Sequence, residues 1–154
     1  MLTKIISAFP GTGKTFYHNN HKETTLDSDS SNFSWLYLND HKIRNPEFPN
    51  NYINHIKENI GKVDYIFVSS HKEVRQALKE SYLFFYLVYP NINDKQIYIQ
   101  RYINRNSPKP FIDLIENNWE NWINECINEG INETNCANLQ LESNQTISDI
   151  LKNF

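Results

Sequence analysis

One stretch decides the fold, Ala8-Phe9-Pro10-Gly11-Thr12-Gly13-Lys14-Thr15, and it directly follows an apolar run at residues 2–6. Because glycine tolerates positive φ and has no side chain, the two glycines let the backbone wrap an anion with its N–H groups pointing inward. The lysine can reach the β- and γ-phosphates, and the final threonine hydroxyl can ligate Mg²⁺. We therefore interpret the stretch as a P-loop (Walker A) turn. The residues expected to bind nucleotide are Pro10, Gly11, Thr12, Gly13, Lys14 and Thr15.

The first position of the motif departs from the usual pattern. That pattern opens with glycine, whereas this chain has Ala8, which fits if its backbone stays at negative φ. The alternative is a chance Gly-Thr-Gly-Lys-Thr turn. An apolar strand before the motif and a helix after it are the context that distinguishes a P-loop from such a turn.

Size and composition limit the function classes. A chain of 154 residues fits one domain, residues 1–154. The net charge is −3 without a basic stripe, which disfavours stable duplex DNA binding. No apolar run approaches the ~20 residues of a membrane span, and the N-terminal strand feeds the P-loop rather than forming a signal peptide. We expect a cytoplasmic protein, with Cys126 and Cys136 as reduced thiols because they lack metal-ligand spacing.

Strand and helix patterns alternate along the whole chain. This alternation predicts the α/β class, a three-layer α/β/α domain with a five-stranded parallel sheet. The expected strands are residues 2–7, 23–27, 63–69, 83–89 and 138–141. The expected helices are residues 13–20, 49–61, 71–81, 94–106, 110–129 and 147–151.

Two aspartates follow the second predicted strand. In parallel sheets the ligand lies beyond the carboxyl ends of the strands, and the third strand ends in Ser69-Ser70 without the acid a P-loop enzyme usually keeps there. Asp27 and Asp29 face the same side of an extended segment, so one can hold the water shell of a metal while the other accepts the proton of an acceptor hydroxyl. We expect Thr15 and Asp27 on the metal side. The alternative is an Asp/Ser turn that caps a helix.

Two arginines follow the fourth predicted strand. Arg101 and Arg105 are four residues apart and share one helix face. Planar guanidinium groups stabilise the charge of a transferring phosphoryl group, so we interpret residues 101–109 as a lid over the nucleotide. The alternative is a solvated helix face. Arg75, on the helix after the third strand, either meets an acceptor phosphate or faces solvent.

Several other side chains stay open to two interpretations. Phe33, Trp35 and Tyr37 alternate after the aspartates, and they either wall an acceptor pocket or pack in the core. His71 follows the third strand and either contacts a ligand or is a surface residue at a helix start.

With these residues in place, the chain resembles P-loop kinases of the nucleoside monophosphate kinase group, in particular the shikimate-, gluconate- and polynucleotide-kinase-like members. The resemblance rests on residues 11–15, on Asp27 and Asp29, and on the arginines of the lid. It implies a P-loop NTPase fold with strand order 2-3-1-4-5, a Mg-ATP donor site, an acceptor site over the second and third strands, and residues 141–143 under the adenine. A weaker similarity is to nucleotide kinases of bacteriophages.

The function expected from these features is phosphoryl transfer. An ATP- and Mg²⁺-dependent kinase would phosphorylate a hydroxyl of a nucleotide, a nucleoside or a modified base in DNA, with a small molecule or a nucleic-acid end as acceptor. The alternatives are a kinase of another small hydroxyl metabolite and a non-catalytic ATP- or GTP-binding regulatory module. The chain lacks an Asn-Lys-x-Asp guanine motif and the arginine pair that nucleotide acceptors often need, since only Arg44 and Arg75 remain. A monomer and a dimer are both compatible with the sequence.

Overall fold

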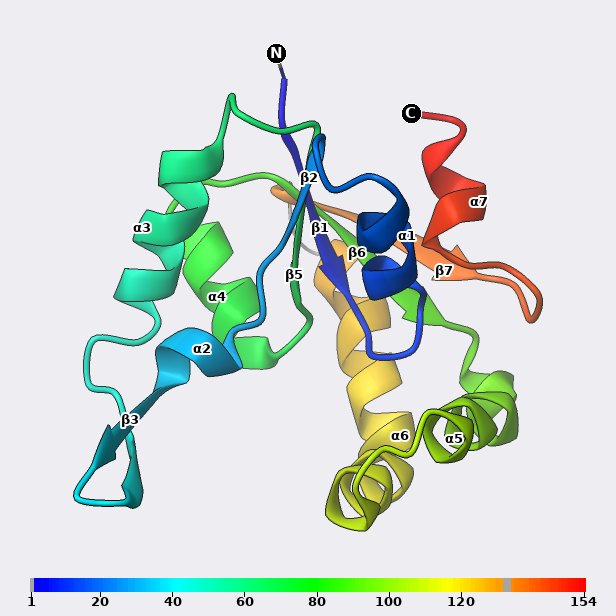
Figure 1. Ribbon diagram of the computed structural model, residues 1–154. Helices are drawn as coiled ribbons and strands as arrows, with labels where there is room; N and C mark the ends of the chain where they lie inside the picture. The colour runs from blue at the N-terminus through cyan, green and yellow to red at the C-terminus, as the bar shows by residue number, and fades with distance from the viewer. Residues whose placement is uncertain (1, 132–133) are drawn as a thin grey trace.

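A computed structural model describes residues 2–131 and 134–154 (Figure 1). Its elements in chain order are β1 (Lys4–Ala8), α1 (Lys14–Asn20), β2 (Thr25–Asp27), α2 (Ser31–Ser34), β3 (Trp35–Leu38), β4 (His41–Arg44), α3 (Asn50–Asn59), β5 (Tyr65–Ser69), α4 (Lys72–Glu80), β6 (Phe85–Pro90), the 3-10 turn η1 (Ile92–Asp94), α5 (Lys95–Asn104), α6 (Lys109–Ile131), β7 (Cys136–Leu141) and α7 (Ile147–Leu151).

The centre of the molecule is a five-stranded parallel sheet in the order β2-β5-β1-β6-β7. The predicted α/β class and parallel sheet are therefore confirmed. The order as numbered differs from the predicted 2-3-1-4-5 because β3 and β4, which we did not expect, lie between the second and third strands of the sheet in sequence. With this pair left out of the numbering, the sheet strands read 2-3-1-4-5.

Alternation along the strands builds a core on each face of the sheet. In β1, Ile5 packs on one face and Ile6 on the other, since successive side chains of a strand point to opposite sides. The face of Ile5 is covered by α3, α4, α5 and α6, and the face of Ile6 by α1 and α7. Both faces of β1 are buried, which explains why its sequence reads as a continuous apolar run.

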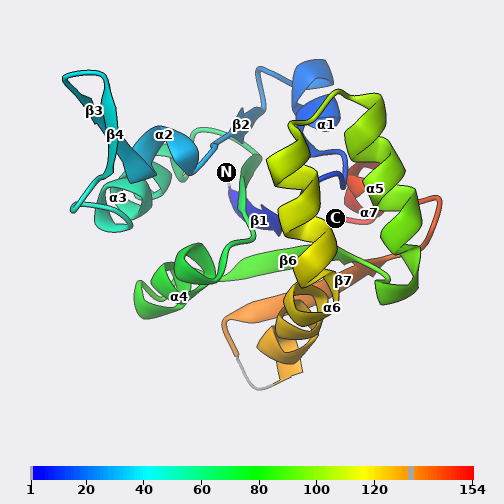
Figure 2. The ribbon, with the colours of Figure 1, turned by 90° about the horizontal axis from the view of Figure 1, so that it is seen from below.

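Strands β3 and β4 form an antiparallel hairpin that extends from the main sheet (Figures 1 and 2). Trp35 pairs with Arg44, and Leu38 pairs with His41. The turn uses Asn39 at φ 51° and Asp40 at φ 65°, and two left-handed residues are typical of a type I′ hairpin turn. The apolar residues before Asn-Asp were therefore a hairpin signal that the sequence analysis missed.

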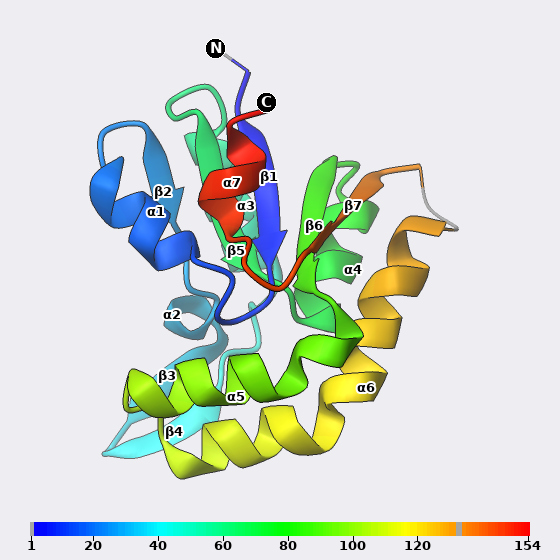
Figure 3. The ribbon, with the colours of Figure 1, turned by 90° about the vertical axis from the view of Figure 1, so that its right-hand side faces the viewer.

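Two helices close the carboxyl edge of the sheet. Figure 3 shows α5 and the first half of α6 side by side beyond the tip of β1, where the β1–α1 loop also lies. This arrangement places α5 against the loop that the sequence singled out. Within the described ranges, no helix is long and apolar enough to cross a membrane.

Candidate functional site

The loop between β1 and α1 has the backbone conformation of an anion-binding turn. Gly11 has φ 86° and Gly13 has φ 97°, which residues with side chains rarely adopt. A Cβ on Gly11 would lie 2.9 Å from Cε1 of Tyr102, and one on Gly13 would lie 3.1 Å from Cβ of Thr146. Glycine is therefore needed at both positions for conformation and for space.

The neighbouring elements fix this loop by hydrogen bonds. The hydroxyl of Tyr102 on α5 donates to the carbonyl of Pro10 at 2.7 Å, and the guanidinium of Arg101 donates to the carbonyl of Gly11 at 3.0 Å. From the other side, the N–H of Ile147 at the start of α7 donates to the carbonyl of buried Thr12 at 2.9 Å. The carbonyls of three consecutive loop residues are therefore held by α5 and by the start of α7.

A hydroxyl and a carboxylate meet beside the loop. Oγ1 of Thr15, in the first turn of α1, donates to Oδ2 of Asp27 at the end of β2 over 3.1 Å. Mg²⁺ is usually held by one or two protein oxygens together with waters and substrate phosphates, so this pair fits such an ion. No group of three or more His, Cys, Asp and Glu side chains able to hold a metal exists among residues 2–131 and 134–154, and magnesium bound with phosphates does not require one.

The segment after β2 is held from the core. The N–H of Ser28 donates to the carbonyl of Phe67, the hydroxyl of Tyr52 donates to the carbonyl of Ser28, and the hydroxyl of Ser28 is hydrogen-bonded to Nε2 of His55. Oδ1 of Asp29 accepts the N–H of Ser31 at 2.9 Å, as expected from the turn interpretation. Asp29 also lines the cleft described next, so the turn presents its carboxylate to that cleft.

The candidate residues surround one cleft of about 460 Å³, which we call the loop cleft. It lies at the carboxyl edge of the sheet and carries three permanent cations, Lys14, Arg101 and Arg105, beside the carboxylate of Asp29. Asp27 is not a lining residue, but it accepts the hydrogen bond of Thr15, which does line the cleft. The lining residues are Ala8, Pro10, Gly11, Gly13, Lys14, Thr15, Phe16, Asp29, Ser69, Ser70, His71, Arg101, Arg105 and Phe111.

The two arginines of α5 sit differently. Arg101 is half-buried, stacks 4.4 Å from the ring centroid of Tyr98 and contacts the loop. Arg105 is exposed, lies over the rings of Tyr102 and Phe111, and donates from Nε to the hydroxyl of Ser107 at 3.0 Å. Arg101 therefore holds the loop, whereas Arg105 stands at the mouth of the cleft. A lid at residues 101–109 stays a prediction.

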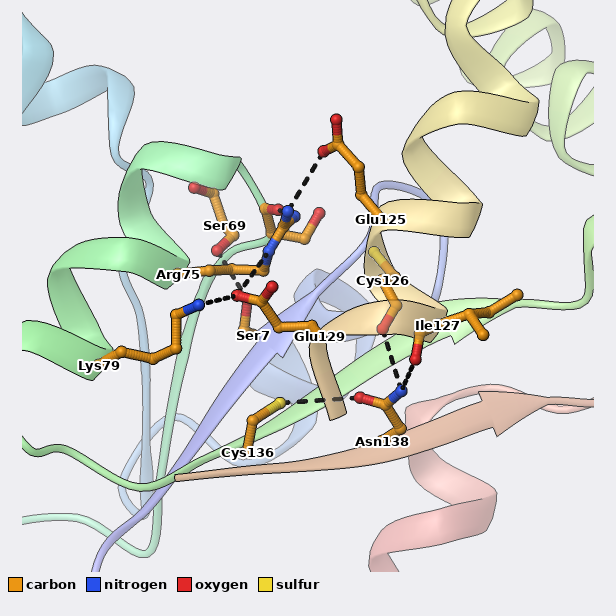
Figure 4. Close-up of polar contacts among 11 residues, drawn as sticks. Ser7, Ser69, Arg75, Lys79, Glu125, Cys126, Ile127, Glu129, Cys136 and Asn138 are labelled. Atoms are coloured by element: carbon orange, nitrogen blue, oxygen red, sulfur yellow. Dashed lines mark hydrogen bonds and ion pairs between the residues drawn. The ribbon is translucent and has the colours of Figure 1, made fainter. Parts of the chain in front are cut away.

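Arg75 does not face solvent. It is 3% exposed, donates to the carbonyl of Ser70 and pairs with Glu125 at 3.2 Å and Glu129 at 3.5 Å, and Lys79 contacts the same Glu129 at 3.0 Å (Figure 4). The network joins α4 to α6 across the end of β5. The charge of Arg75 is thus balanced by carboxylates of the protein itself.

The aromatic trio separates into three environments. Phe33 packs against Tyr52 and His55 at the edge of the core, Tyr37 is 72% exposed, and Trp35 lines a second cleft of about 360 Å³. We call this second space the hairpin cleft. It is lined by Asp29, Ser30, Ser31, Ser34, Trp35, Arg44, Phe48, His71 and Glu73.

His71 lies where the two clefts meet. His71 is exposed, yet partial desolvation, followed by the positive charges of Lys14 and Arg75, lowers the pKa of His71 below its ordinary value, and the charge of Asp29 opposes the shift. The two cysteines take no part in either cleft. Burial raises the pKa of Cys126 to about 11 and that of Cys136 to about 12, so both are protonated thiols at neutral pH.

Sequence reasoning missed the supports of the site. Tyr98 and Tyr102 are buried at helical spacing on α5, and Tyr102 also donates a hydrogen bond to the carbonyl of Pro10. The loop after β7 reaches the same place, since the hydroxyl of Ser143 donates to Asp94 and the carbonyl of Ser143 lies 3.5 Å from Arg101. Helical spacing shows that a tyrosine is buried, but it does not show which carbonyl its hydroxyl meets.

Comparison of the sequence with models of known protein families and with curated proteins gave no match.

Proposed function

We propose that the protein is an ATP-dependent phosphotransferase with a P-loop NTPase fold, which moves the γ-phosphate of Mg-ATP to a hydroxyl of a nucleotide, a nucleoside or a modified base in DNA. One observation carries the proposal. The hydrogen bond from Thr15 to Asp27 stands beside a glycine loop whose carbonyls are already held from outside. Pairing a threonine hydroxyl with a carboxylate next to a phosphate nest suits a nucleotide-bound Mg²⁺.

The roles follow from where the residues lie. The N–H groups of the loop and the ammonium of Lys14 hold the donor phosphates, while Thr15 and Asp27 hold the magnesium side. When bound, Mg²⁺ supplies charge neutralisation at the phosphates. Arg101 and Arg105 add positive charge where the γ-phosphate develops negative charge.

Asp29 is the residue we assign to the acceptor, because it lines both clefts. The acceptor oxygen forms a bond to the γ-phosphorus, and the bond from that phosphorus to the β–γ bridging oxygen breaks. The products are ADP and the phosphorylated acceptor, and Asp29 accepts the proton of the hydroxyl.

The proposal is tested by ADP release from Mg-ATP in the presence of nucleosides, nucleotides and short single strands. We expect turnover with at least one acceptor, and a loss of at least about 100-fold in Lys14→Ala, since its charge acts on the phosphates. Lys22→Ala is the matched control, because Lys22 is exposed and lies outside the cleft. ATP binding without ADP release for any acceptor would favour the regulatory module instead.

A further inference from the structure

The hairpin cleft continues the loop cleft on its acceptor side. The two clefts share Asp29 and His71, and the hairpin, α2 and the start of α4 supply the remaining walls. A molecule in the hairpin cleft can therefore present a hydroxyl to Asp29 at the border, while the rest of that molecule lies against the hairpin.

A flat surface of rings and a guanidinium forms one side of this cleft. The guanidinium of Arg44 lies 4.8 Å from the ring centroid of Phe48 and 5.4 Å from that of Trp35, its partner across the hairpin. Nζ of Lys42 lies 4.2 Å from the same indole. Nucleobases stack on aromatic rings and on arginine planes, and this preference does not depend on the base.

The charges of the hairpin cleft disfavour a phosphate. Among the described residues that line it, Arg44 alone has a permanent positive charge, and that charge is paired with Glu73 on α4. The carboxylate of Asp29 is exposed at the border, and desolvation followed by the charge of Lys14 lowers the pKa of His71, which disfavours a positive charge on its ring. Among the lining residues, two carboxylates (Asp29 and Glu73) thus face one guanidinium (Arg44), a balance that disfavours an added phosphate, and Lys42 beside Trp35 is not a lining residue.

We propose that the hairpin cleft binds the base of an acceptor nucleoside, either free or at the end of a single strand, by stacking against Trp35 and Arg44, with no acceptor phosphate in the cleft. Ser31 and Ser34 also line this cleft. The fate of the acceptor hydroxyl rests on the proposed kinase function, whereas binding of the base does not require ATP.

Calorimetric titration without ATP tests the binding. The probes are the four common deoxynucleosides, their 5′-monophosphates and a dinucleotide with a free 5′-hydroxyl. We expect at least one deoxynucleoside to bind more tightly than its own 5′-monophosphate. If the dinucleotide binds more tightly still, the end of a strand is the source of the base, and if it does not, the source is the free nucleoside.

Substitutions on the hairpin separate stacking from general damage. Trp35→Ala should weaken nucleoside binding about tenfold, since stacking on one aromatic ring contributes on the order of that factor. Trp35→Phe retains a ring and should retain most of the affinity, which guards against a misfolded hairpin. Tyr37→Ala is the matched control, because Tyr37 lies on the same hairpin face but is 72% exposed and outside the cleft.

The Arg44–Glu73 pair provides a second, independent readout. Glu73→Gln removes the charge that neutralises Arg44, so the 5′-monophosphates should gain affinity while the nucleosides bind as before. Glu80→Gln, at the exposed far end of α4, should change neither. Tighter binding of every 5′-monophosphate to the unsubstituted protein, or unchanged nucleoside binding in Trp35→Ala, would overturn the inference.

Failure of this inference is distinguishable from failure of the proposed function. Nucleoside binding that depends on Trp35, without ADP release for any acceptor, would reject the kinase and keep the cleft assignment. ADP release with an acceptor whose affinity ignores Trp35 would reject the cleft assignment and keep the kinase.

Discussion

The β1–α1 loop and the β3–β4 hairpin wall adjoining clefts, but they are held in opposite ways. The carbonyls of Pro10, Gly11 and Thr12 accept hydrogen bonds from α5 and from the start of α7, and Thr12 is fully buried. Among the strands of the described residues, β3 and β4 pair only with each other, and Tyr37 and Leu38 are 72% and 55% exposed. Two-stranded hairpins are marginally stable alone, whereas a loop held from several sides is fixed before its ligand binds.

This difference separates donor from acceptor recognition. Substitutions in or under the loop should disturb nucleotide binding and stability together, because the same contacts serve both. Substitutions in the hairpin should change acceptor binding and leave nucleotide binding unaffected. The four predictions below test whether that division holds, beginning with the residues between the two regions.

The largest effects are expected from the paired aspartates. Asp29→Asn should lower kcat by about 10²–10⁴-fold with little change in nucleotide affinity, because it removes the proton acceptor while keeping the size of the side chain. Asp27→Asn should instead raise the Mg²⁺ concentration needed for half-maximal activity, since Asp27 lies against Thr15. Steady-state kinetics over a Mg²⁺ titration separates the two. Equal Mg²⁺ dependence in both variants would contradict the assigned roles, and two fully active variants would leave the segment as a turn.

The region around the paired aspartates also shows which structural features the sequence can predict. The motif at residues 11–15 predicts a loop between a strand and a helix, and the observed β1 and α1 lie on either side of it. Local patterns predict such elements because apolar runs, glycines and helix starts act within a few residues of each other. The contact of Thr15 with Asp27 spans twelve residues and two elements, so sequence proximity alone does not provide it.

The burial of Arg75 and the β3–β4 hairpin are two features that local sequence patterns did not predict. The partners of Arg75, Glu125 and Glu129, lie fifty or more residues away on α6, so its burial is a product of tertiary packing. The hairpin had a local signal in Asn39 and Asp40, but the Gly that marks the strongest type I′ turns is absent. The hairpin cleft is a tertiary feature of the same kind, because Trp35 and Arg44 of the hairpin and Glu73 of α4 line it together.

The second prediction tests whether the contacts from α5 and α7 hold the β1–α1 loop rigidly. Gly11→Ala should lower the free energy of unfolding by about 1–3 kcal/mol and weaken nucleotide binding, because a Cβ at φ 86° also meets Tyr102 at 2.9 Å. Tyr102 is fully buried and hydrogen-bonded to Pro10, so it has little room to move. Chemical denaturation and nucleotide titration provide the two readouts.

Gly61→Ala is the matched control for that experiment. Gly61 has φ 88°, close to that of Gly11, but a Cβ there would have no neighbour within 4 Å in the part of the chain that the structure describes. Both variants carry the backbone strain, and only Gly11→Ala carries the clash. If Gly11→Ala and Gly61→Ala lower the free energy of unfolding equally and nucleotide binding is intact, the β1–α1 loop adapts to the added Cβ. The loop would then not be more rigidly held than the hairpin.

The third prediction separates the two arginines of α5. Arg105→Ala should lower kcat about tenfold or more with nucleotide affinity nearly unchanged, because a guanidinium at the mouth acts mainly on charge that develops in the transition state. Arg101→Ala should also weaken nucleotide binding, since Arg101 holds the carbonyl of Gly11. Hydrogen exchange of residues 101–109 should decrease when a non-hydrolysable ATP analogue binds. If the analogue does not change hydrogen exchange and the variant with both Arg101→Ala and Arg105→Ala turns over normally, the segment is a solvated helix face rather than a lid.

The smallest effect is expected at His71, where the loop cleft and the hairpin cleft meet. Desolvation and, after it, the positive charge of Lys14 lower the pKa of His71, so Lys14→Ala should raise that pKa, and Lys22→Ala should not. The titration of the imidazole resonances by NMR measures it directly.

The lowered pKa of His71 also determines the direction in which the free energy of unfolding changes with pH. The pKa of His71 in the folded protein lies below that of an unfolded histidine, so the unfolded state binds more protons as the pH falls. The contribution of neutral His71 to the free energy of unfolding is therefore complete above a pH of about 6.5 and is lost as the pH falls through the folded-state pKa. His71→Gln should remove this part of the pH dependence. A pKa in Lys14→Ala that stays the same or falls would mean that Lys14 does not point toward the shared corner, and the two clefts would then lack the electrostatic link that joins donor and acceptor sides.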